Sequence, residues 1–250
     1  MKEAAIISHR LDSQWTDGWA VLNGLSAFAL PAVWLIDSLG AQHRLGGVIR
    51  GIVPAHDLKR AARFQQPMHA WRFEVTNAVL RLLLAKVTGT SAQTLTFRPG
   101  YHGKPELDDV HEGIFFNVSY SEQFSLIAID RRPVGVDIEW LGRPLVIHDM
   151  LDASFSDTEI KFINASQDET LHRFFTLWTR KEAVLKLTGE GIGEHLPQFS
   201  VLDGVCSTEK RMIGKDVPDT IWLYTFAAGD RFLGSFATEL QEPVPAFYKL

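Results

Sequence analysis

Two carboxylates stand two positions apart in an otherwise apolar segment, Asp137 and Glu139 in "GVDIEW" at 135–140. Side chains alternate between the two faces of a β-strand, so both acids point to one face while Val136 and Ile138 point to the other. Two like charges this close repel each other unless a proton or a cation lies between them. Magnesium is typically held by one or two carboxylates, with water and phosphate oxygens completing its octahedron. The spacing therefore fits a magnesium site, although two acids on a solvated sheet face would give the same pattern.

A later helical segment carries the residue types that would complete such a site. In "WTRKEAVLK" at 178–186, Trp178, Glu182 and Lys186 recur every four residues and share one helix face, with Lys181 beside them. Glu182 would add a third carboxylate, and Lys186 would reach an anion bound to the same metal. The same spacing also describes an ordinary Glu–Lys pair on a solvated helix. The helix alone does not decide between these interpretations.

Basic residues gather in one stretch of a chain whose formal net charge is -5. The overall charge argues against a general nucleic-acid binder, because binding to a phosphate backbone depends mainly on basic surface. The local excess predicts either a solvated helix face or a site for a compact anion such as a phosphate group. His56 and His69 lie in the same stretch, and Asp57 is its one acid. The basic residues are Arg50, Lys59, Arg60, Arg63 and Arg72.

An internal echo indicates how the elements that position these residues are arranged. "FEVTNAVLRL" at 73–82 matches "WTRKEAVLKL" at 178–187, with the Ala, the Val and both Leu residues identical. Apolar periodicity predicts a long helix around each copy, at 68–87 and at about 168–188. A glycine follows each helix, as is common at helix C-termini. The two copies suggest two units of similar plan.

Shorter helices and strands surround the two long helices. Helical segments are predicted at 55–64 and 156–165, and Ser156 with Glu159 forms a capping-box pattern at the start of the second. Strand-like runs follow the long helices. These runs lie at 94–98, 114–120, 124–130 and 134–140 in the first part, and at 198–202, 220–226 and 231–237 in the second.

The predicted fold class is α+β, a pseudo-two-fold pair of similar α+β halves, each with a long helix packed on a small antiparallel sheet. We expect an N-terminal half at 1–133 and a C-terminal half at 134–250, with a ligand groove between them. No apolar run reaches the roughly 20 residues needed to span a bilayer, and no export signal is visible, so we expect a cytoplasmic protein. Cys206 is the single cysteine, which excludes an internal disulfide.

Together these segments resemble a known family. "GVDIEW" followed by "FFTLWTRKEAVLKLTGEG" is similar to the signature of the 4'-phosphopantetheinyl transferases, G-[IV]-D-[IV]-E and then W-x-x-K-E-A-x-x-K. Further matches in order are "RFQQPMHAWR" at 63–72, "HGKPEL" at 102–107, "FFNVSYS" at 115–121 and "FSDTEI" at 155–160. The spacing resembles the surfactin-synthetase-activating type, a monomer that looks like two fused copies of a smaller subunit.

The resemblance implies an activity and a metal. Such enzymes move the phosphopantetheine arm of coenzyme A to a serine of an apo carrier protein and release adenosine 3',5'-bisphosphate. Asp137, Glu139 and Glu182 would hold magnesium, for which manganese is a possible substitute, against the coenzyme A pyrophosphate. Lys186 and Lys181 would stabilise the charge that develops on the leaving phosphate. Glu182 is also the candidate base for the serine, directly or through a metal-bound water.

The resemblance also implies coenzyme A contacts. Basic residues would hold the 3'-phosphate, and a "GKP" loop would border the adenine. Ser119 matches a phosphate-contacting serine, whereas Tyr120 replaces a histidine found in many relatives, and its hydroxyl can donate a hydrogen bond but adds no positive charge. The residues assigned to the 3'-phosphate and the adenine are Arg60, Arg63, Arg72, Gly103, Lys104 and Pro105.

The expected partners are coenzyme A and an acyl, polyketide or peptidyl carrier protein, which would place the protein in fatty acid, polyketide or nonribosomal peptide biosynthesis. Neither nucleic acid nor a membrane is expected as a partner. The alternatives are a non-catalytic module that binds coenzyme A or a carrier, and a magnesium-dependent phosphodiester hydrolase. The sequence names neither the carrier nor its docking residues, and it gives no role to positions 1–50.

Overall fold

The computed structural model describes residues 2–24, 28–100, 103–108, 113–191, 193, 195–214 and 217–250 of the chain. It has a mixed α+β fold. The α-helices are α1 (Gly18–Asn23), α2 (Ser38–Leu45), α3 (Ile49–Ile52), α4 (Ala55–Ala61), α5 (Pro67–Thr88), α6 (His148–Ser154), α7 (Asp157–Asn164) and α8 (Thr170–Thr188). The strands are β1 (Glu3–Leu11), β2 (Thr16–Asp17), β3 (Ala32–Asp37), β4 (Phe97–Pro99), β5 (Pro105–Leu107), β6 (Phe115–Ser121), β7 (Phe124–Asp130), β8 (Val134–Trp140), β9 (Gly204–Glu209), β10 (Thr220–Ala227), β11 (Phe232–Thr238) and β12 (Ala246–Lys249).

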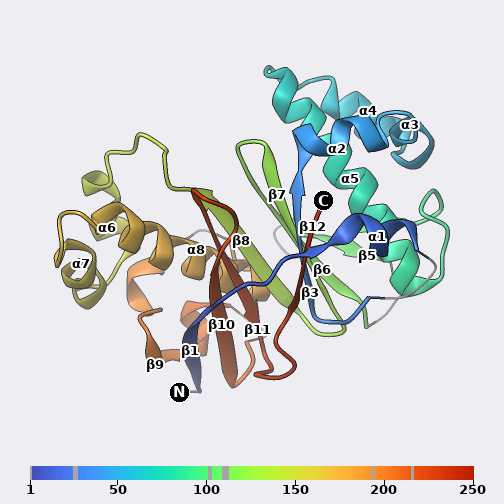
Figure 1. Cartoon of the computed structure of the whole chain (residues 1–250). Helices are drawn as coiled ribbons and strands as arrows, with labels where there is room; N and C mark the ends of the chain where they lie inside the picture. The colour runs from blue at the N-terminus through green and yellow to red at the C-terminus, as the bar shows by residue number, and fades with distance from the viewer. Residues whose placement is uncertain are drawn as a thin grey trace.

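Two five-stranded sheets form the centre of the molecule, with α1–α5 flanking one and α6–α8 flanking the other (Figure 1). The first sheet has the order β2-β12-β3-β7-β6, and the second has the order β8-β11-β10-β1-β9. Neighbouring strands are antiparallel along β6-β7-β3 in the first sheet and along β8-β11-β10 in the second. The next pair in each sheet, β3 with β12 and β10 with β1, is parallel. The prediction of purely antiparallel sheets is therefore wrong, because each sheet also contains a parallel strand from one end of the chain. This strand is β12 in the first sheet and β1 in the second.

The terminal strands cross between the two halves. β1, at the N-terminus, lies between β10 and β9 in the sheet covered by α8. β12, near the C-terminus, lies between β3 and β2 in the other sheet. In Figure 1, β1 lies in the half that contains α6–α8, whereas β2 and α1, which follow it, lie in the other half. Conversely, β12 lies in the half that contains α1–α5, whereas β11, which precedes it, lies in the half that contains α8. The boundary between 133 and 134 does fall between β7 and β8, but neither sheet consists of one continuous half of the chain.

The long helices α5 and α8 end as the sequence predicts. Gly89 and Gly189 adopt left-handed backbone conformations with φ of 73° and 77° and close the helices through hydrogen bonds to Ala85 O and Leu185 O. A residue with a Cβ adopts this conformation only at a cost, so glycine is the common choice here. The capping box of α7 is also confirmed, with Ser156 and Glu159 bonded reciprocally.

Three apolar clusters hold these layers together. α5 packs Val79 and Leu83 against Trp34 of the first sheet. α8 packs residues such as Leu177 against the second sheet. A third cluster, which includes Val136, lies between the two sheets. Burial of apolar surface on both faces of each sheet makes the sheets a firm support for any site at their edges.

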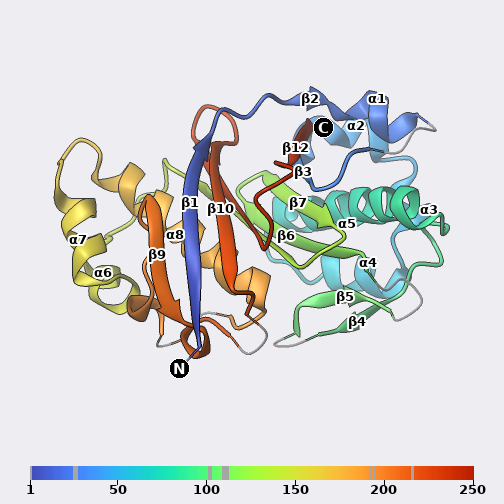
Figure 2. The same ribbon diagram turned by 90° about the horizontal axis from the view of Figure 1, so that it is seen from below.

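One predicted strand is absent. The segment 198–202 forms the end of a 3-10 helix, Leu196–Gln198, followed by irregular chain. Side chains rather than a neighbouring strand bind its backbone, as described below. The first predicted strand, at 94–98, is found in part as β4 (Phe97–Pro99), which forms a short hairpin with β5, and Figure 2 shows this hairpin in the same half as α5 and β6. Among the described residues, no helix is long and apolar enough to cross a membrane.

Candidate active site

A glycine allows α8 to lie very close to β8. A Cβ atom at Gly135 would stand 1.9 Å from Ala183 O and 2.4 Å from Leu187 N, so a larger residue would push the helix away. The close approach places Glu182 and Lys186 of the helix beside the strand that carries Asp137. Gly135, the glycine of "GVDIEW", is therefore needed for α8 to pack closely against β8 at the site.

Asp137 is the centre of a buried polar cluster. Its side chain is 5% exposed, and Oδ1 lies 2.7 Å from Lys186 Nζ. The same oxygen accepts a hydrogen bond of 2.7 Å from Ser119 Oγ, and Lys186 Nζ also donates to that hydroxyl over 2.9 Å. As predicted, Val136 and Ile138 point to the opposite face, into the cluster between the sheets. The strand thus places Asp137 on its face toward α8, and Val136 and Ile138 on its face toward the core.

Two glutamates next to Asp137 are destabilised as anions. Burial, followed by the negative charge of Asp137, raises the pKa of Glu139 and of Glu182 to about 7. The charge of Arg143, then that of Lys186 and a hydrogen bond from Trp178, oppose the shift at Glu139, and Lys186 opposes it at Glu182. Three carboxyl groups therefore share a region in which Lys186 and, at Glu139, Arg143 supply only part of the compensating charge.

The donor atoms of this cluster fit a hard divalent cation. Asp137 Oδ2 and Glu182 Oε1 are both buried and have no hydrogen-bond partner among the described residues, which is costly for carboxylate oxygens. Carboxylate oxygens are ligands that magnesium prefers. Within the described ranges, no three His, Cys, Asp or Glu side chains converge as a ready metal cluster, and Lys186 contacts the remaining oxygen of Asp137. The ligand types and the two unpartnered oxygens thus suit magnesium.

A cavity of about 510 Å³ opens in the other half of the molecule, between α4, α5, the β4–β5 hairpin and β6. Arg60 and Arg72 in its wall come from the stretch singled out in the sequence, and Arg98 of β4 also lines it. Arg60 packs over the ring of Phe73 at 5.2 Å, and Arg72 packs over the ring of Tyr120 at the same distance. Arg72 also donates to the carbonyl of Glu122. Two guanidinium groups held by aromatic rings at an open cavity are suited to binding an anion.

Comparison with known proteins identifies the family. The model of the 4'-phosphopantetheinyl transferase superfamily matches residues 133–233. A Synechocystis sp. protein named "Putative 4'-phosphopantetheinyl transferase slr0495" is 31% identical over 172 residues, which are 67% of this chain and 68% of that protein. The chain belongs to the 4'-phosphopantetheinyl transferase superfamily.

Other members of the superfamily match over a similar part of the chain. The 4'-phosphopantetheinyl transferase HetI of Nostoc sp. is 34% identical over 142 residues, or 55% of this chain and 60% of that protein. The 4'-phosphopantetheinyl transferase Sfp of Bacillus subtilis is 29% identical over 155 residues, or 60% of this chain and 68% of that protein. The matches therefore leave about a third or more of each of these relatives uncovered.

The structure divides the residues assigned from the family resemblance into two groups. Asp137, Glu182, Lys186 and Ser119 meet at the β8–α8 contact, with Glu139 on the same side of the strand. A second set lines the cavity: Arg60, Arg72, Gly103, Pro105 and Tyr120. Arg63 is exposed and is not part of the cavity wall. His102, at the start of the matched loop, lies outside the described residues.

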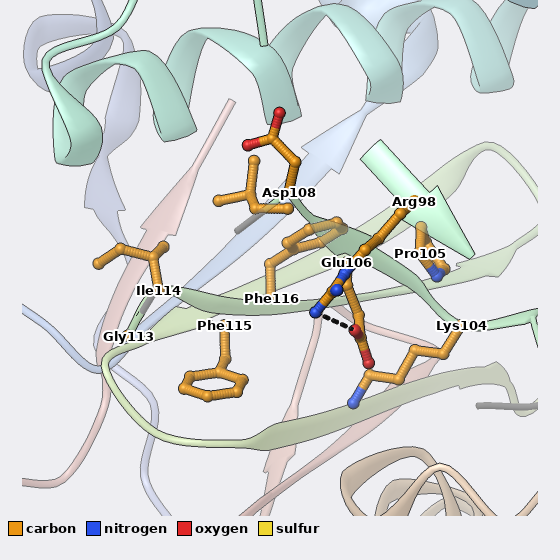
Figure 3. Close-up of a pocket in the computed structure, with 10 residues that line it drawn as sticks. Arg98, Lys104, Pro105, Glu106, Asp108, Gly113, Ile114, Phe115 and Phe116 are labelled. Carbon is orange, nitrogen blue, oxygen red and sulfur yellow. Dashed lines mark ion pairs between the residues drawn. The ribbon is translucent and has the colours of Figure 1, made fainter. Parts of the chain in front are cut away.

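Lys104 has a different role from the neighbouring residues of its loop. Its Nζ donates to Lys186 O over 2.6 Å and to Val134 O over 3.2 Å, so the side chain ties the hairpin to the second half. Burial lowers the pKa of Lys104 to about 8. The residue lines a second cavity, of about 350 Å³, in which Arg98 and Glu106 form an ion pair of 3.5 Å (Figure 3). Gly103 and Pro105 face the larger cavity, whereas Lys104 does not line it.

Lys181 does not reach the carboxylate cluster, and this part of the prediction needs correction. Its side chain is fully buried, with Nζ 2.8 Å from Glu159 Oε2. It also donates to Leu196 O and Phe199 O over 2.6 and 2.7 Å. Consecutive residues of a helix are rotated by about 100°, so Lys181 leaves the face that Glu182 and Lys186 share. It belongs to the core under α7.

Some residues near the site were not identified from the sequence. Asn77 of α5 lines the larger cavity. The internal echo aligns it with Glu182, which was a usable signal because both residues occupy the same position of the two long helices. Asn117 and Ser121 bind the backbone of β8 from β6. Polar residues at every second position of a buried strand, as in "NVSYS", were the signal for this pair.

Proposed function

We propose that the protein transfers the 4'-phosphopantetheine arm of coenzyme A to the serine hydroxyl of an apo acyl, polyketide or peptidyl carrier protein, with release of adenosine 3',5'-bisphosphate. Membership of the transferase superfamily supports this activity. The observation that carries it is the position of β6, where Ser119 contacts the acidic cluster and the next residue, Tyr120, lines the basic cavity. One ligand with a phosphorylated nucleoside and a pyrophosphate would reach both places.

Each group has a chemical part in this reaction. Arg60 and Arg72 bind the 3'-phosphate at the cavity, where two fixed positive charges favour a dianion. Lys186 lies beside the pyrophosphate and stabilises the charge that develops on the leaving phosphate. Asp137 and Glu182, with Glu139, would hold magnesium or manganese, which supplies further charge stabilisation to the pyrophosphate when bound.

The proton of the attacking serine needs an acceptor. The serine oxygen forms a bond to the phosphorus that carries the pantetheine arm, and the bond from this phosphorus to the bridging oxygen of the pyrophosphate breaks. Glu182 Oε1 has no hydrogen-bond partner, and burial raises the pKa of Glu182 to about 7. Without a bound cation, a carboxylate with that pKa is well matched to accept the serine proton near neutral pH, whereas a cation held by the same carboxylate would lower its pKa and weaken it as a base.

The proposal includes a pseudo-two-fold arrangement in a single monomer. The matching strand pairings support it, since β6-β7-β3-β12 and β8-β11-β10-β1 share one sequence of antiparallel and parallel contacts. The equivalent positions of α5 and α8 in the internal echo support it as well. In this arrangement the two halves have diverged, one toward binding the nucleotide and the other toward the chemistry.

The test is to incubate the protein with coenzyme A, magnesium and a panel of apo carriers and to weigh each carrier by mass spectrometry. We expect a mass gain of one phosphopantetheine, lost with EDTA and in Asp137→Asn. Asp130→Asn is the matched control, because Asp130 is a buried acid at the end of β7, the strand that precedes β8 in the chain, and lies outside the cluster. Coenzyme A binding without mass gain on any carrier would favour the non-catalytic module. A wild-type rate in Asp137→Asn would contradict the metal assignment.

A further inference from the structure

In the part of the chain that the structure describes, no strand pairs with the outer edge of β8. β8 is the last strand of its sheet and pairs with β11 on one side only. Alternate backbone amides of an edge strand point away from the sheet and need another partner when they are buried. Because Val136 and Ile138 are fully buried, solvent cannot provide that partner. The edge faces β6 of the other sheet.

Side chains of β6 take the place of the missing strand. Three polar residues at alternating positions each accept a hydrogen bond from one outward amide of β8, always nineteen positions along the chain. The constant separation means that the two strands run alongside each other in a fixed register. The bonds are Val136 N to Asn117 Oδ1 at 2.9 Å, Ile138 N to Ser119 Oγ at 3.4 Å, and Trp140 N to Ser121 Oγ at 3.0 Å.

Ser119, the middle residue of this row, makes two further contacts. Its Oγ donates to Asp137 Oδ1 over 2.7 Å and accepts from Lys186 Nζ over 2.9 Å. A serine hydroxyl has one hydrogen to donate and two lone pairs, so Asp137, Lys186 and Ile138 together use its full capacity. The residue is 4% exposed. This environment leaves the hydroxyl without a free site for a phosphate.

We infer that Ser119 is a positioning residue, which orients Asp137 and Lys186 for the transfer reaction rather than binding a phosphate of coenzyme A. The inference rests on the proposed function. The hydrogen bond to Oδ1 holds the carboxylate of Asp137 so that Oδ2 stays free for a cation, and the contact with Nζ fixes the end of Lys186. Through the same strand, Ser119 connects the acidic cluster to the cavity lined by Tyr120.

The experiment compares Ser119→Ala with Ser121→Ala. Each variant loses one bond to a β8 amide, so Ser121→Ala should lower the thermal midpoint by about 2 to 4 °C, and Ser119→Ala, which also loses its bonds to Asp137 and Lys186, should lower it further. Ser119→Ala alone should lower kcat by about 10- to 100-fold, as expected when a group that orients a metal ligand is removed. Its KM for coenzyme A should stay close to wild type. Ser121→Ala should keep the wild-type kcat, because Ser121 contacts neither acid nor lysine in the described contacts.

A second measurement does not need a carrier. The free Mn²⁺ signal in electron paramagnetic resonance, recorded with coenzyme A present, should show weaker Mn²⁺ binding in Ser119→Ala by about 10- to 100-fold and no change in Ser121→Ala. Equal Mn²⁺ affinity in Ser119→Ala and wild type would overturn the inference. So would a raised KM for coenzyme A with kcat retained, which would make Ser119 a phosphate ligand. If the wild-type protein modifies no carrier, the proposed function fails, and the Mn²⁺ comparison still decides the role of Ser119.

Discussion

Lys181 Nζ and Glu159 Oε2 form an ion pair of 2.8 Å, and both side chains are completely buried. The pair joins α8 to α7. Lys181 also binds two carbonyls of the irregular segment that follows α8, and Glu159 Oε1 accepts from Val201 N at 2.9 Å. The buried Lys181–Glu159 pair therefore holds three segments of backbone together: α7, α8 and the segment at 196–201. The pair lies away from the acidic cluster.

Removal of one partner of this pair should destabilise the fold. Lys181→Met leaves the Glu159 carboxylate buried without its counter-charge, which typically lowers the free energy of unfolding by about 3 to 5 kcal/mol. Urea unfolding followed by circular dichroism measures the loss. Lys161→Met, on the exposed surface of α7, is the control and should change little.

The double variant Lys181→Met/Glu159→Gln separates structure from catalysis. Because it removes both charges, it should recover part of the lost stability and bind coenzyme A with the wild-type affinity. A large fall in coenzyme A affinity with unchanged stability would instead show that Lys181 reaches the phosphates, as the family resemblance suggested.

The acidic cluster should make stability depend on pH in the absence of metal. The folded-state pKa of Glu139 and of Glu182 is raised from 4.5 to about 7, so the folded protein keeps protons that the unfolded chain has already released. The free energy of unfolding should consequently fall as the pH rises from about 4.5 to about 7. A metal binds the deprotonated carboxylates, so magnesium should raise the thermal midpoint more at about pH 8 than at about pH 5.5.

Thermal unfolding across this pH range, in EDTA and in magnesium, checks both statements. Glu139→Gln/Glu182→Gln is the reference, because it cannot titrate at these positions and should flatten the slope. An identical slope in this variant would assign the pH dependence to other groups.

Local patterns in the sequence were enough to predict the elements that carry the site. β8 and β7 occupy the predicted residues, and α8 ends at Gly189 because a left-handed residue can follow the helix there. The exchange of terminal strands was beyond such reasoning. β1 and β10 are joined only by long-range pairing, and the predicted strand at 198–202 lacks any neighbouring strand with which to pair.

The site, like the fold, was only partly predictable from the sequence. The helix period predicted that Glu182 and Lys186 share one face, the family resemblance implied that they join Asp137, and the structure brings the three together. Lys181 was misplaced because adjacent helix residues face different neighbours, and only packing decides which face is buried. The bonds of Lys104 to Lys186 O and Val134 O likewise depend on the docking of two halves. A sequence alone does not specify that docking.

Two arginines that are three positions apart, Arg60 and Arg63, differ in their position relative to the cavity. Arg60 lines the cavity and is held against Phe73, whereas Arg63 is exposed outside its wall. If the cavity binds the 3'-phosphate, Arg60→Leu should raise KM for coenzyme A by about 10- to 100-fold, because the variant loses a hydrogen bond between charged groups. Arg63→Leu should leave KM unchanged. Steady-state kinetics with a mass-resolved carrier provide the values.

The same variants assayed with 3'-dephospho-coenzyme A locate the effect on the phosphate. A substrate that lacks this group cannot lose a contact with it, so Arg60→Leu should hardly change KM for the dephospho compound, and wild-type enzyme should bind that compound more weakly than coenzyme A. An equal rise in KM for both substrates would mean that Arg60 acts on another part of coenzyme A or on the shape of the cavity. A rise in Arg63→Leu as large as in Arg60→Leu would show that general surface charge attracts the substrate, and added salt should then weaken both effects.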